Sequence, residues 1–506
     1  NGDPFVMKYN GEYYCYSSGS DGVNLLHSLD LVHFEHRGLC MQEEGAHEYW
    51  APCVIYDNGK FYMYYSTNPL GEYDDHAHCL KLAVADSPCG PFTYVKQFFD
   101  NFSIDPHVIK DGQGEFYMFY SVNNYSGTDR NLAGTVIVAD KMPDLEHLEG
   151  KPFPVIMPSI KEEVFAVNRF GDGRDWHTIE GAFYLEKGDN AYVMYSANCF
   201  VNPTYFVGYA VADREGRIAD YRFRKYPDDY TYEPFIHQND KVGGTGHNSV
   251  VKAPNNVDDW IVYHGHEQLP GEEDLVRFRA MRIDPIFWGK EKMYTTAPSS
   301  GQQDAPAEPV YRNLYRDGMD REITGEGEWE VKGGCLCQNS SSGITNMYLA
   351  DISLRNYLYE INVKWSRHHY GGRYGMYAAY VDPANNVQVI LNEGERCLEM
   401  FAVINGVFSE AKKTAVDSRF SFQVFHKLTV RRTDSCFQVY LDDVEMCTAQ
   451  YEIAAGSAGV INYYTAAMYD SLELTEYLEL NRENAAGFMR QVETGQKSLE
   501  RNWVIS

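Results

Sequence analysis

One strand–turn–strand pattern recurs five times in the first part of the chain, and it restricts the possible folds more than any other feature. In the clearest copy, residues 104–109 read as a strand, a tight turn containing Gly114 follows, and residues 116–121 read as a second, aromatic-rich strand. The copies open at Asp3, Ala51, Asp105, Glu180 and His247. Ordered copies of this kind, separated by about 50 to 75 residues, indicate a radial repeat.

A third segment follows each copy and supports the same count. These segments are residues 26–34, 82–87, 136–140, 209–213 and 279–285. Three strands and a weaker fourth per unit make a propeller blade, so the sequence predicts an all-β fold that begins with a five-bladed β-propeller. The alternative is a generic all-β domain in which Tyr-rich strands resemble one another by chance.

The five opening residues carry the functional prediction. In a propeller, the first strand of each blade lines the central channel, so these residues should share one ring at its mouth. The ring would then gather two aspartates, one glutamate and one histidine, at Asp3, Asp105, Glu180 and His247. Neighbouring carboxylates raise one another's pKa, so a fold gathers them at a cost. Such a cluster indicates a metal site or acid–base chemistry.

Length and charge limit the domain count and the class of partner. A chain of 506 residues is too long for a single core and should divide into two or three domains. A formal net charge of −28 argues against nucleic acid, whose phosphates the protein would repel. A neutral oligosaccharide or polysaccharide meets no such repulsion, and 40 tyrosines suit a surface that stacks on sugars.

The cysteines and the apolar segments bear on location. Eleven cysteines follow no disulfide spacing, and Cys335 with Cys337 lacks a second pair for zinc. Reduced thiols indicate a cytoplasmic protein. We expect no membrane association, because no apolar run approaches the length of a membrane span. The chain opens at Asn1 rather than Met, which leaves open whether a leading segment was removed. The sequence makes no prediction of oligomeric state.

The domain boundaries follow from changes in pattern. We predict the propeller over residues 1–298 and a Ser-, Gly-, Gln- and Pro-rich linker over 299–309. Alternating strands then indicate an antiparallel β-sandwich over 310–480, similar to concanavalin-like jelly rolls. Residues 481–506 are predicted to form a tail or the start of a further segment.

Aromatic residues beside the predicted mouth are candidates for substrate contact. Trp50 could stack on the apolar face of a sugar, or it could pack between blades. Trp176 ends a long connection that suits a pocket wall, and Phe5 follows the opening of the first blade. His107 should point into the channel below Asp105, where a hydrogen-bonded structural role is the simpler interpretation.

Three carboxylates on one ring suit glycoside cleavage. One acid protonates the leaving oxygen, a second carboxylate activates water or attacks directly, and a third can adjust the acid. A cation site is the alternative, because Asp, Glu and His all ligate metals.

Five short motifs together resemble glycoside hydrolase family 43. They are Gly2-Asp3-Pro4, Trp50-Ala51-Pro52, Ser103-Ile104-Asp105-Pro106, Ile179-Glu180-Gly181 and Gly246-His247-Asn248-Ser249. Each is weak alone, but they occur in the family's order, one per blade, across residues 1–298. The resemblance implies an inverting, exo-acting hydrolase that removes α-L-arabinofuranosyl or β-D-xylosyl units from plant-type polysaccharides or oligosaccharides, with no cofactor needed for the chemistry.

The resemblance also implies a role for each site residue. Asp3 is similar to the general base, Glu180 to the general acid, and Asp105 to the residue that orients the acid. His247 matches a channel histidine that in many relatives faces a bound calcium or a water network. Arg279 matches an arginine that reaches the substrate and the orienting aspartate. Inversion leaves room for a water, so we predict that the Asp3 and Glu180 carboxyls lie roughly 6.5–9.5 Å apart.

Arg277 and Arg282 compete with Arg279 for the arginine position. An endo-1,5-α-L-arabinanase remains an alternative activity, and so does a carbohydrate-binding protein without turnover. Fructan-cleaving propellers fit less well, because Ile104 and Gly181 stand where their motifs have Arg and Cys. The sandwich could bind sugar, lend a loop to the pocket, or act as a brace.

Overall fold

The computed structural model describes residues 2–123, 132–268, 278–319, 323–367, 372–476, 478–480 and 503–505. Within these residues the fold is almost entirely β, with short 3-10 helices at Asp75–Ala77, Lys161–Glu163 and Ile218–Asp220. No helix in this part of the chain combines the length and apolar character needed to cross a membrane. Arg277 falls outside the described residues.

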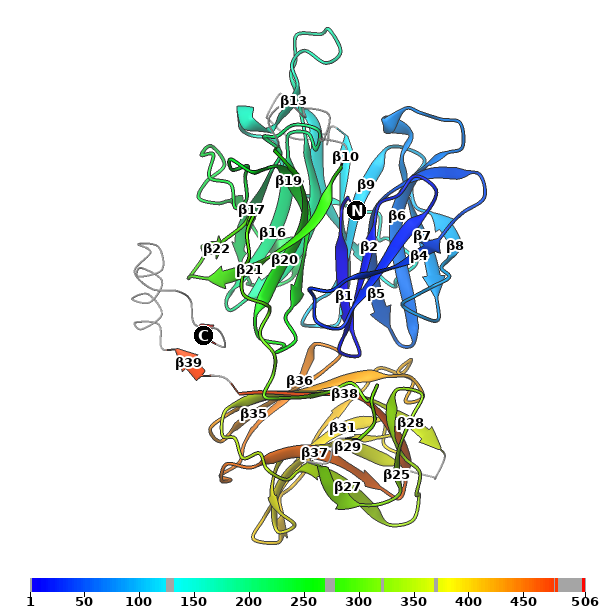
Figure 1. The fold of residues 1–506 in the computed structure, drawn as a ribbon, viewed down its shortest axis with the longest axis vertical. Coiled ribbons are helices and arrows are strands. Elements are labelled where there is room, and N and C mark those ends of the chain that lie inside the picture. Colours follow the sequence, from blue (N-terminus) through cyan, green and yellow to red (C-terminus); the bar gives the residue numbers. More distant parts are fainter. Residues whose placement is uncertain are drawn as a thin grey trace.

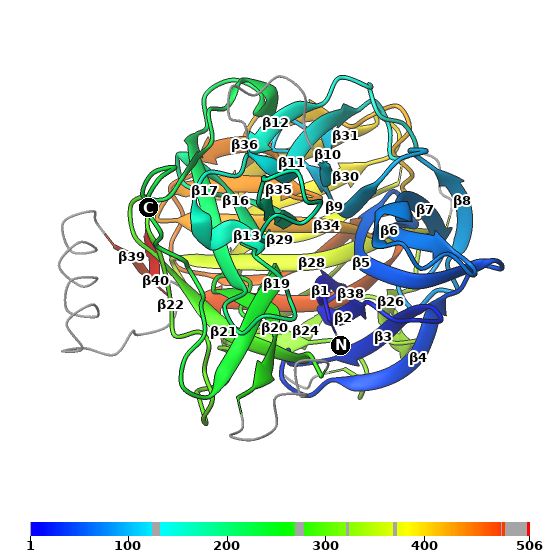
Figure 2. The same ribbon diagram turned by 90° about the horizontal axis from the view of Figure 1, so that it is seen from above.

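Five antiparallel sheets form the five blades of the predicted propeller, and Figure 2 looks down on them with β1, β5, β9 and β19 near the centre. The first two blades are β1 Phe5–Tyr9, β2 Glu12–Ser17, β3 Val23–Ser28 and β4 Glu35–Met41, then β5 Ala46–Asp57, β6 Lys60–Pro69, β7 Cys79–Ala85 and β8 Thr93–Gln97. The third is β9 Ser103–Lys110, β10 Phe116–Asn123, β11 Ala133–Met142 and β12 Phe153–Ile156, with β13 Val164–Ala166 and β14 Trp176–His177 at its edge. The last two are β15 Ile179–Lys187, β16 Asn190–Ala197, β17 Phe206–Asp213 and β18 Arg224–Lys225, then β19 Val242–Lys252, β20 Asp259–Glu267, β21 Ala280–Trp288 and β22 Met293–Thr295.

Four of the five innermost strands carry an irregularity in their pairing. In β5, β9, β15 and β19 the pairing with the next strand skips a residue near the start of the strand. A residue with positive φ stands at each of these places and at the start of the first blade: Asp3 (52°), Ala51 (44°), Asp105 (57°), Gly181 (64°) and His247 (47°). A β-bulge of this kind bends the strand and re-aims its side chains at the channel mouth.

The bulges correct one detail of the predicted ring. Gly181 occupies the position equivalent to Asp3 and Asp105, whereas Glu180 stands one residue earlier and pairs with Ser196. Glu180 is therefore equivalent to Trp50, which pairs with Ser66 in blade two. The side chain of Glu180 reaches the mouth from this neighbouring position rather than from the bulge itself.

Contacts between the first and last blades close the ring. The Ser249 hydroxyl donates to the carbonyl of Pro4 at 2.8 Å and accepts from the amide of Val6 at 3.1 Å. Tyr13 adds a hydrogen bond to the carbonyl of Lys252 at 2.9 Å. These bonds fix Asp3 relative to His247, although the two residues lie at opposite ends of the propeller sequence.

Two antiparallel sheets packed face to face form the sandwich. In one sheet the order is β25 Trp329–Lys332, β26 Cys335–Gln338, β38 Ala466–Glu476, β28 Tyr357–Arg367, β34 His426–Thr433, β35 Cys436–Leu441 and β36 Val444–Gln450, and β23 Tyr311–Asn313 pairs with β38. In the other it is β24 Ile323–Glu326, β27 Ile344–Leu349, β37 Ser457–Tyr463, β29 Arg373–Asp382, β30 Asn385–Asn392, β31 Cys397–Ile404 and β32 Val407–Phe408, and β33 Lys412–Ala415 pairs with β31. Near the chain's end, β39 Leu478–Leu480 pairs in parallel with β40 Trp503–Ile505.

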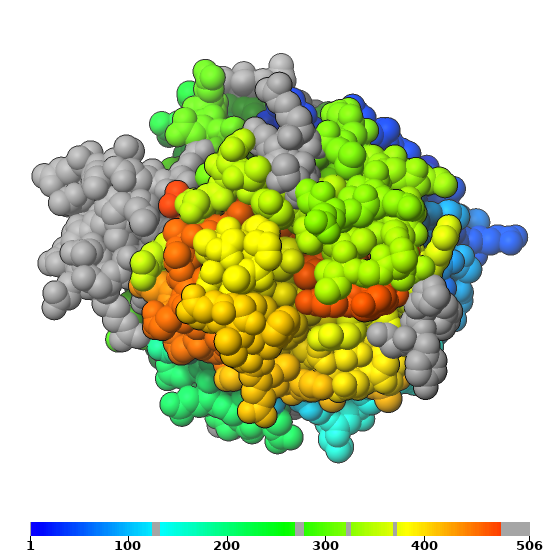
Figure 3. Space-filling model, turned by 90° about the horizontal axis from the view of Figure 1, so that it is seen from below, coloured from blue at the N-terminus to red at the C-terminus, as the bar shows by residue number. Residues whose placement is uncertain are grey.

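The sandwich packs against the propeller face that carries the hairpin turns (Figure 1), and from below it covers most of the molecule (Figure 3). The β1–β2 and β5–β6 turns are Asn-Gly pairs with positive φ at both residues, as in type I′ hairpins. A Cβ on Gly11 would lie 2.5 Å from Leu314, and one on Gly59 would lie 2.6 Å from Val424. Glycine is required there by the turn and by the approach of the sandwich.

A buried charge cluster joins the two domains. Glu473 of β38 is fully buried and binds Lys8 and Arg312, each at 3.0 Å. Asn256, in the β19–β20 turn, also donates to Glu473, at 2.6 Å. Because the sandwich sits at this end of the propeller, its described residues contribute nothing to the mouth that holds Asp3 and Glu180.

The substitution Glu473→Gln tests how much this cluster stabilises the protein. It leaves two partly buried cations without their carboxylate, so we expect a loss of about 3 kcal/mol in the free energy of unfolding, measured in urea. Asp434→Asn removes a surface pair with Arg355, in which both side chains are at least 60% exposed, and should cost about 0.5 kcal/mol. Equal losses in the two variants would contradict a stabilising role for the buried cluster.

Candidate active site

Asp3 lies at the centre of the mouth and is held as an anion. Its carboxylate accepts hydrogen bonds from Arg279 at 2.7 Å and from the Ser18 hydroxyl at 2.6 Å. The Nδ1 atoms of His247 and His264 each lie 3.4 Å from it. Burial opposes ionisation, but the charge of Arg279, with the hydrogen bond from Ser18, outweighs burial and holds the pKa of Asp3 well below its usual range.

Gly2 makes the Asp3–Arg279 pair possible. A Cβ at Gly2 would lie 2.2 Å from the guanidinium carbon of Arg279, so the arginine occupies the space that a side chain would fill. Arg279 is also braced by Phe200, whose ring centre lies 4.6 Å from that carbon. Arg279 forms an ion pair with Asp3, and its charge also acts on Asp105, the orienting aspartate of the sequence prediction. Arg282 instead pairs with Glu267.

Asp105 is buried and Glu180 is half-buried, and each affects the ionisation of the site. The amide of Gly181 donates to Asp105 at 3.0 Å, so the bulge of blade four binds the carboxylate of blade three. Burial raises the pKa of Asp105, and the charges of Glu180 and Asp3 raise it further. The three carboxylates predicted from separate blades therefore share one electrostatic environment.

Glu180 is suited to hold a proton near neutrality. Burial raises the pKa of Glu180 to about 7, with Asp3 adding to the rise, while a hydrogen bond from the Tyr205 hydroxyl at 2.7 Å and the charge of Arg279 oppose it. The pKa values of Asp3 and Glu180 are thus pushed in opposite directions. Such separation of two carboxylates is the arrangement that assigns one as a base and the other as an acid.

Two neutral histidines complete the surroundings of Asp3. Burial lowers the pKa of both His247 and His264. The Nδ1 atom of His264 accepts from the amide of Asp3 at 3.3 Å, and Tyr205 stacks on its ring. His264 and Tyr205 were missed by the sequence reasoning. The only signal for His264 was its place at the end of the fifth aromatic strand.

The sequence comparisons bear on this site. A sequence model described as Glycosyl hydrolases family 43 matches residues 1–294, which is more than half of the chain. The chain belongs to glycoside hydrolase family 43. It is 26% identical to a protein named beta-xylosidase from Xylanibacter ruminicola over 322 residues, covering 57% of this chain and 94% of that protein.

Two further proteins are similar to the propeller part of this chain. A protein from Bacteroides ovatus named xylosidase/arabinosidase is 25% identical over 305 residues, covering 53% of this chain and 86% of that protein. Among solved structures, a thermostable family-43 glycoside hydrolase is 31% identical with a TM-score of 0.52, covering 61% of this chain and 96% of that structure.

A pocket of about 110 Å³ opens on the Glu180 side of this family-43 site. Its aromatic and polar lining includes Trp50, His76, Phe102, Phe165, Arg169, Trp176, Glu180 and Phe200. Trp50 lines the pocket, and its ring stacks on His78 of the same blade at 3.5 Å, so stacking on a sugar stays a prediction. Trp176 is buried in the pocket wall, where its strand β14 pairs with β11.

Phe5 and His107 lie below the carboxylates rather than in the pocket wall. Both line a channel space of about 20 Å³ under Asp3 and Asp105. The ring of His107 stacks on Phe183 at 4.2 Å, and Phe5 packs on both rings. The His107 Nδ1 atom accepts from the amide of Tyr184 at 2.8 Å, which is the structural role expected from the sequence.

Calcium near His247 stays a prediction. Calcium takes roughly six to eight oxygen ligands, whereas His247 offers a nitrogen beside the Asp3 carboxylate. The buried Asn248 Oδ1 atom has no hydrogen-bond partner and lines the same channel, so one further oxygen is available there. No group of three His, Cys, Asp or Glu ligand atoms gathers around His247 within the described residues. No step of the chemistry below depends on a metal.

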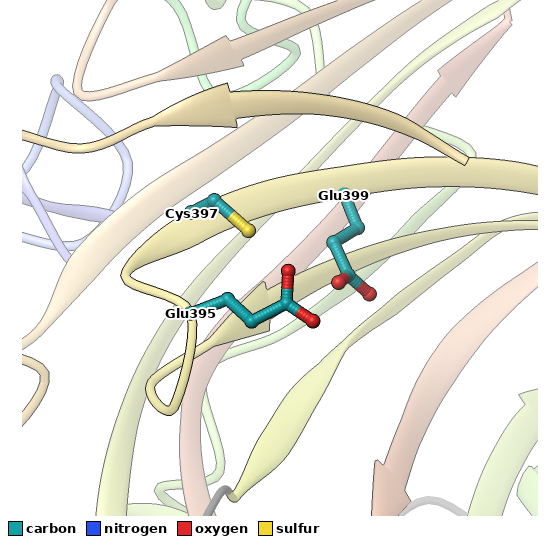
Figure 4. A group of neighbouring side chains, drawn as sticks. All are labelled: Glu395, Cys397 and Glu399. Carbon is teal, nitrogen blue, oxygen red and sulfur yellow. The ribbon is translucent and has the colours of Figure 1, made fainter.

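One such group does occur in the sandwich. The potential ligand atoms of Glu395, Cys397 and Glu399 lie within 4.8 Å of one another (Figure 4). Their carboxylates are already paired, because Lys413 contacts both glutamates and Arg373 binds Glu399. Ion pairing accounts for this cluster, which lies in the other domain from Asp3 and Glu180.

The substitution Gly2→Ala tests the Asp3–Arg279 pair without altering either residue. The new methyl group should push the guanidinium away from Asp3, so we expect kcat to fall by about tenfold or more because a misplaced base loses part of its catalytic effect. Gly112→Ala is the control, since its Cβ would meet nothing closer than 3.8 Å, and it should retain activity. Full activity in Gly2→Ala would show that the pair is dispensable.

Proposed function

We propose that this chain is an inverting, exo-acting glycoside hydrolase that removes terminal α-L-arabinofuranosyl or β-D-xylosyl units. The observation that carries the proposal is the opposed pKa shifts of Asp3 and Glu180 around one mouth. The names of the similar xylosidase and xylosidase/arabinosidase support the two sugars. The small pocket supports an exo mode, because it fits the end of a chain better than a chain that passes through it.

The proposed reaction is a single displacement. Asp3 takes a proton from a water molecule, whose oxygen forms a bond to the anomeric carbon as the bond to the leaving oxygen breaks. Glu180 donates its proton to that leaving oxygen. Asp105, whose carboxylate is held by the amide of Gly181, is the residue that orients Glu180 in this scheme. Water replaces the leaving group on the opposite face, so the released sugar has the opposite anomeric configuration.

Substrate preference is tested with aryl α-L-arabinofuranoside, aryl β-D-xyloside and debranched arabinan. We expect one of the two aryl glycosides to be hydrolysed, with inversion seen by NMR of the first product. Release of internal fragments from debranched arabinan would instead support an endo-arabinanase. Binding of sugars without hydrolysis of any substrate would overturn the proposed activity.

The roles of the two carboxylates can be separated by leaving group. Glu180→Ala should lower kcat by about 10²–10⁴ on an oligosaccharide, whose leaving oxygen needs a proton, but far less on a dinitrophenyl glycoside, which does not. Asp3→Ala should lower kcat on both substrates, because the water must be activated in either case. A loss that does not depend on the leaving group in Glu180→Ala would contradict its role as the acid.

The pH profile tests the environment of Glu180. An acid must be protonated, so kcat/KM should fall as the pH rises through about 7, the pKa of Glu180. The Tyr205 hydroxyl stabilises the ionised form, so Tyr205→Phe should move this alkaline limb to higher pH. Tyr117→Phe removes a longer tyrosine–glutamate bond, at 3.3 Å to Glu115 in blade three, and should leave the limb in place. A shift to lower pH in Tyr205→Phe would contradict the assignment.

A further inference from the structure

Arg169 is a pocket residue that the reaction described above does not use. It lies between β13 and β14, on a segment that rises from the propeller face opposite the sandwich (Figure 1). Its half-buried side chain lines the same pocket as Glu180. The guanidinium carbon lies 4.7 Å from the ring centre of Phe165 and 5.4 Å from those of Phe170 and Trp176. Three aromatic rings therefore hold the cation in place.

Among the residues that the structure describes, none accepts a hydrogen bond from Arg169. A guanidinium that contacts aromatic faces keeps its N–H groups in its own plane, free to bind a further group. No carboxylate lies within 4.0 Å of Arg169, and no hydrogen bond from it occurs within the described ranges. The nearby arginines differ, because Arg279 is paired with Asp3 and Arg174 with Asp172.

The charge of Arg169 acts on this side of the pocket. The pKa of His76, another wall residue, is lowered by burial and next by Arg169, whereas Asp74 and Asp75 raise it. Asp75 also lines the pocket but is exposed to solvent, which screens its charge. A preorganised cation with no ion-pair partner among the described residues is thus presented to the pocket of a chain whose net charge is −28.

We propose that Arg169 determines specificity by binding the carboxylate of a uronic acid in the leaving group, next to the sugar that is removed. This inference rests on the proposed function, in which Glu180 must contact the leaving oxygen. The leaving group then extends along the Glu180 side, where Arg169 lies. The planar fork of a guanidinium matches a carboxylate through two parallel hydrogen bonds, a geometry that neutral sugars do not offer.

The test compares one oligosaccharide in two forms, with its uronic acid free or converted to the methyl ester. The ester keeps the shape and removes the charge. We expect kcat/KM to be about tenfold higher for the free acid, mainly through KM, since a hydrogen bond to a charged group stabilises binding by this order. Arg169→Gln should abolish the preference and leave hydrolysis of a neutral aryl glycoside within about twofold.

Two further variants separate charge from structure. Arg169→Lys should retain part of the preference, because it keeps the charge but not the fork. Arg174 lies on the same segment and is already paired with Asp172. The variant Arg174→Gln should therefore retain the full preference for the free acid. Equal cleavage of acid and ester by the unsubstituted chain would overturn the proposal. So would an equal loss on both forms in Arg169→Gln, as expected from a structural role alone.

Binding distinguishes failure of this inference from failure of the proposed function. In the Glu180→Gln background, calorimetry with the acid and the ester measures recognition without turnover. Tighter binding of the acid, lost in the Glu180→Gln/Arg169→Gln double variant, supports the role of Arg169 even if no substrate is hydrolysed by the unsubstituted chain. Equal binding of the two forms overturns it, whatever the outcome of the hydrolysis assays.

Discussion

Mutual repulsion among three buried carboxylates is the constraint on which the rest of this site depends. Asp3, Asp105 and Glu180 cannot all ionise in a space largely closed to water. The structure stabilises the charge of one carboxylate more than the others, because the guanidinium of Arg279 forms an ion pair with Asp3. Asp3 can then remain an anion, and its charge helps to keep Glu180 protonated near neutrality. One asymmetric ion pair thus gives three similar carboxyl groups different proton affinities.

The propeller supplies that asymmetry through its backbone. A residue with positive φ stands at the opening of each blade, in four of them at a bulge of the inner strand, and each blade contributes a different side chain to the channel mouth. In blade four the bulge residue is a glycine, Gly181, and its amide binds the carboxylate of Asp105. The ring of His247 packs directly against Gly181: a Cβ on this glycine would lie 3.3 Å from the Nδ1 atom of His247. A side chain at that position would crowd the histidine that helps to hold Asp3.

The repeat in the sequence was sufficient to predict the blades and the ring, because both follow from strand periodicity and order. The opening residues Asp3 and Asp105 were placed correctly for the same reason. Glu180 was assigned to the bulge position, one residue away from where it lies, because aligned repeats do not reveal which residue adopts positive φ. Glycine at 181 was the available signal, since it is the residue best suited to a left-handed backbone. The position of the sandwich could not be predicted, because it depends on contacts such as Lys8 with Glu473 that join distant parts of the chain.

The residues that sequence reasoning missed share a physical property: each acts on a carboxylate from another strand or blade. Tyr205 precedes the third strand of blade four, and His264 reaches Asp3 from blade five across the closure of the ring. Periodicity predicts which residues face the channel, but it says nothing of which of them meet. Tyr205 illustrates the consequence. Burial alone would raise the pKa of Glu180 further, to a point where the acid donates its proton less readily, and the hydrogen bond from Tyr205 opposes that rise. The proton affinity of Glu180 therefore follows from two opposing effects, burial and one hydroxyl group, and only the folded arrangement brings that hydroxyl within 2.7 Å of the carboxyl.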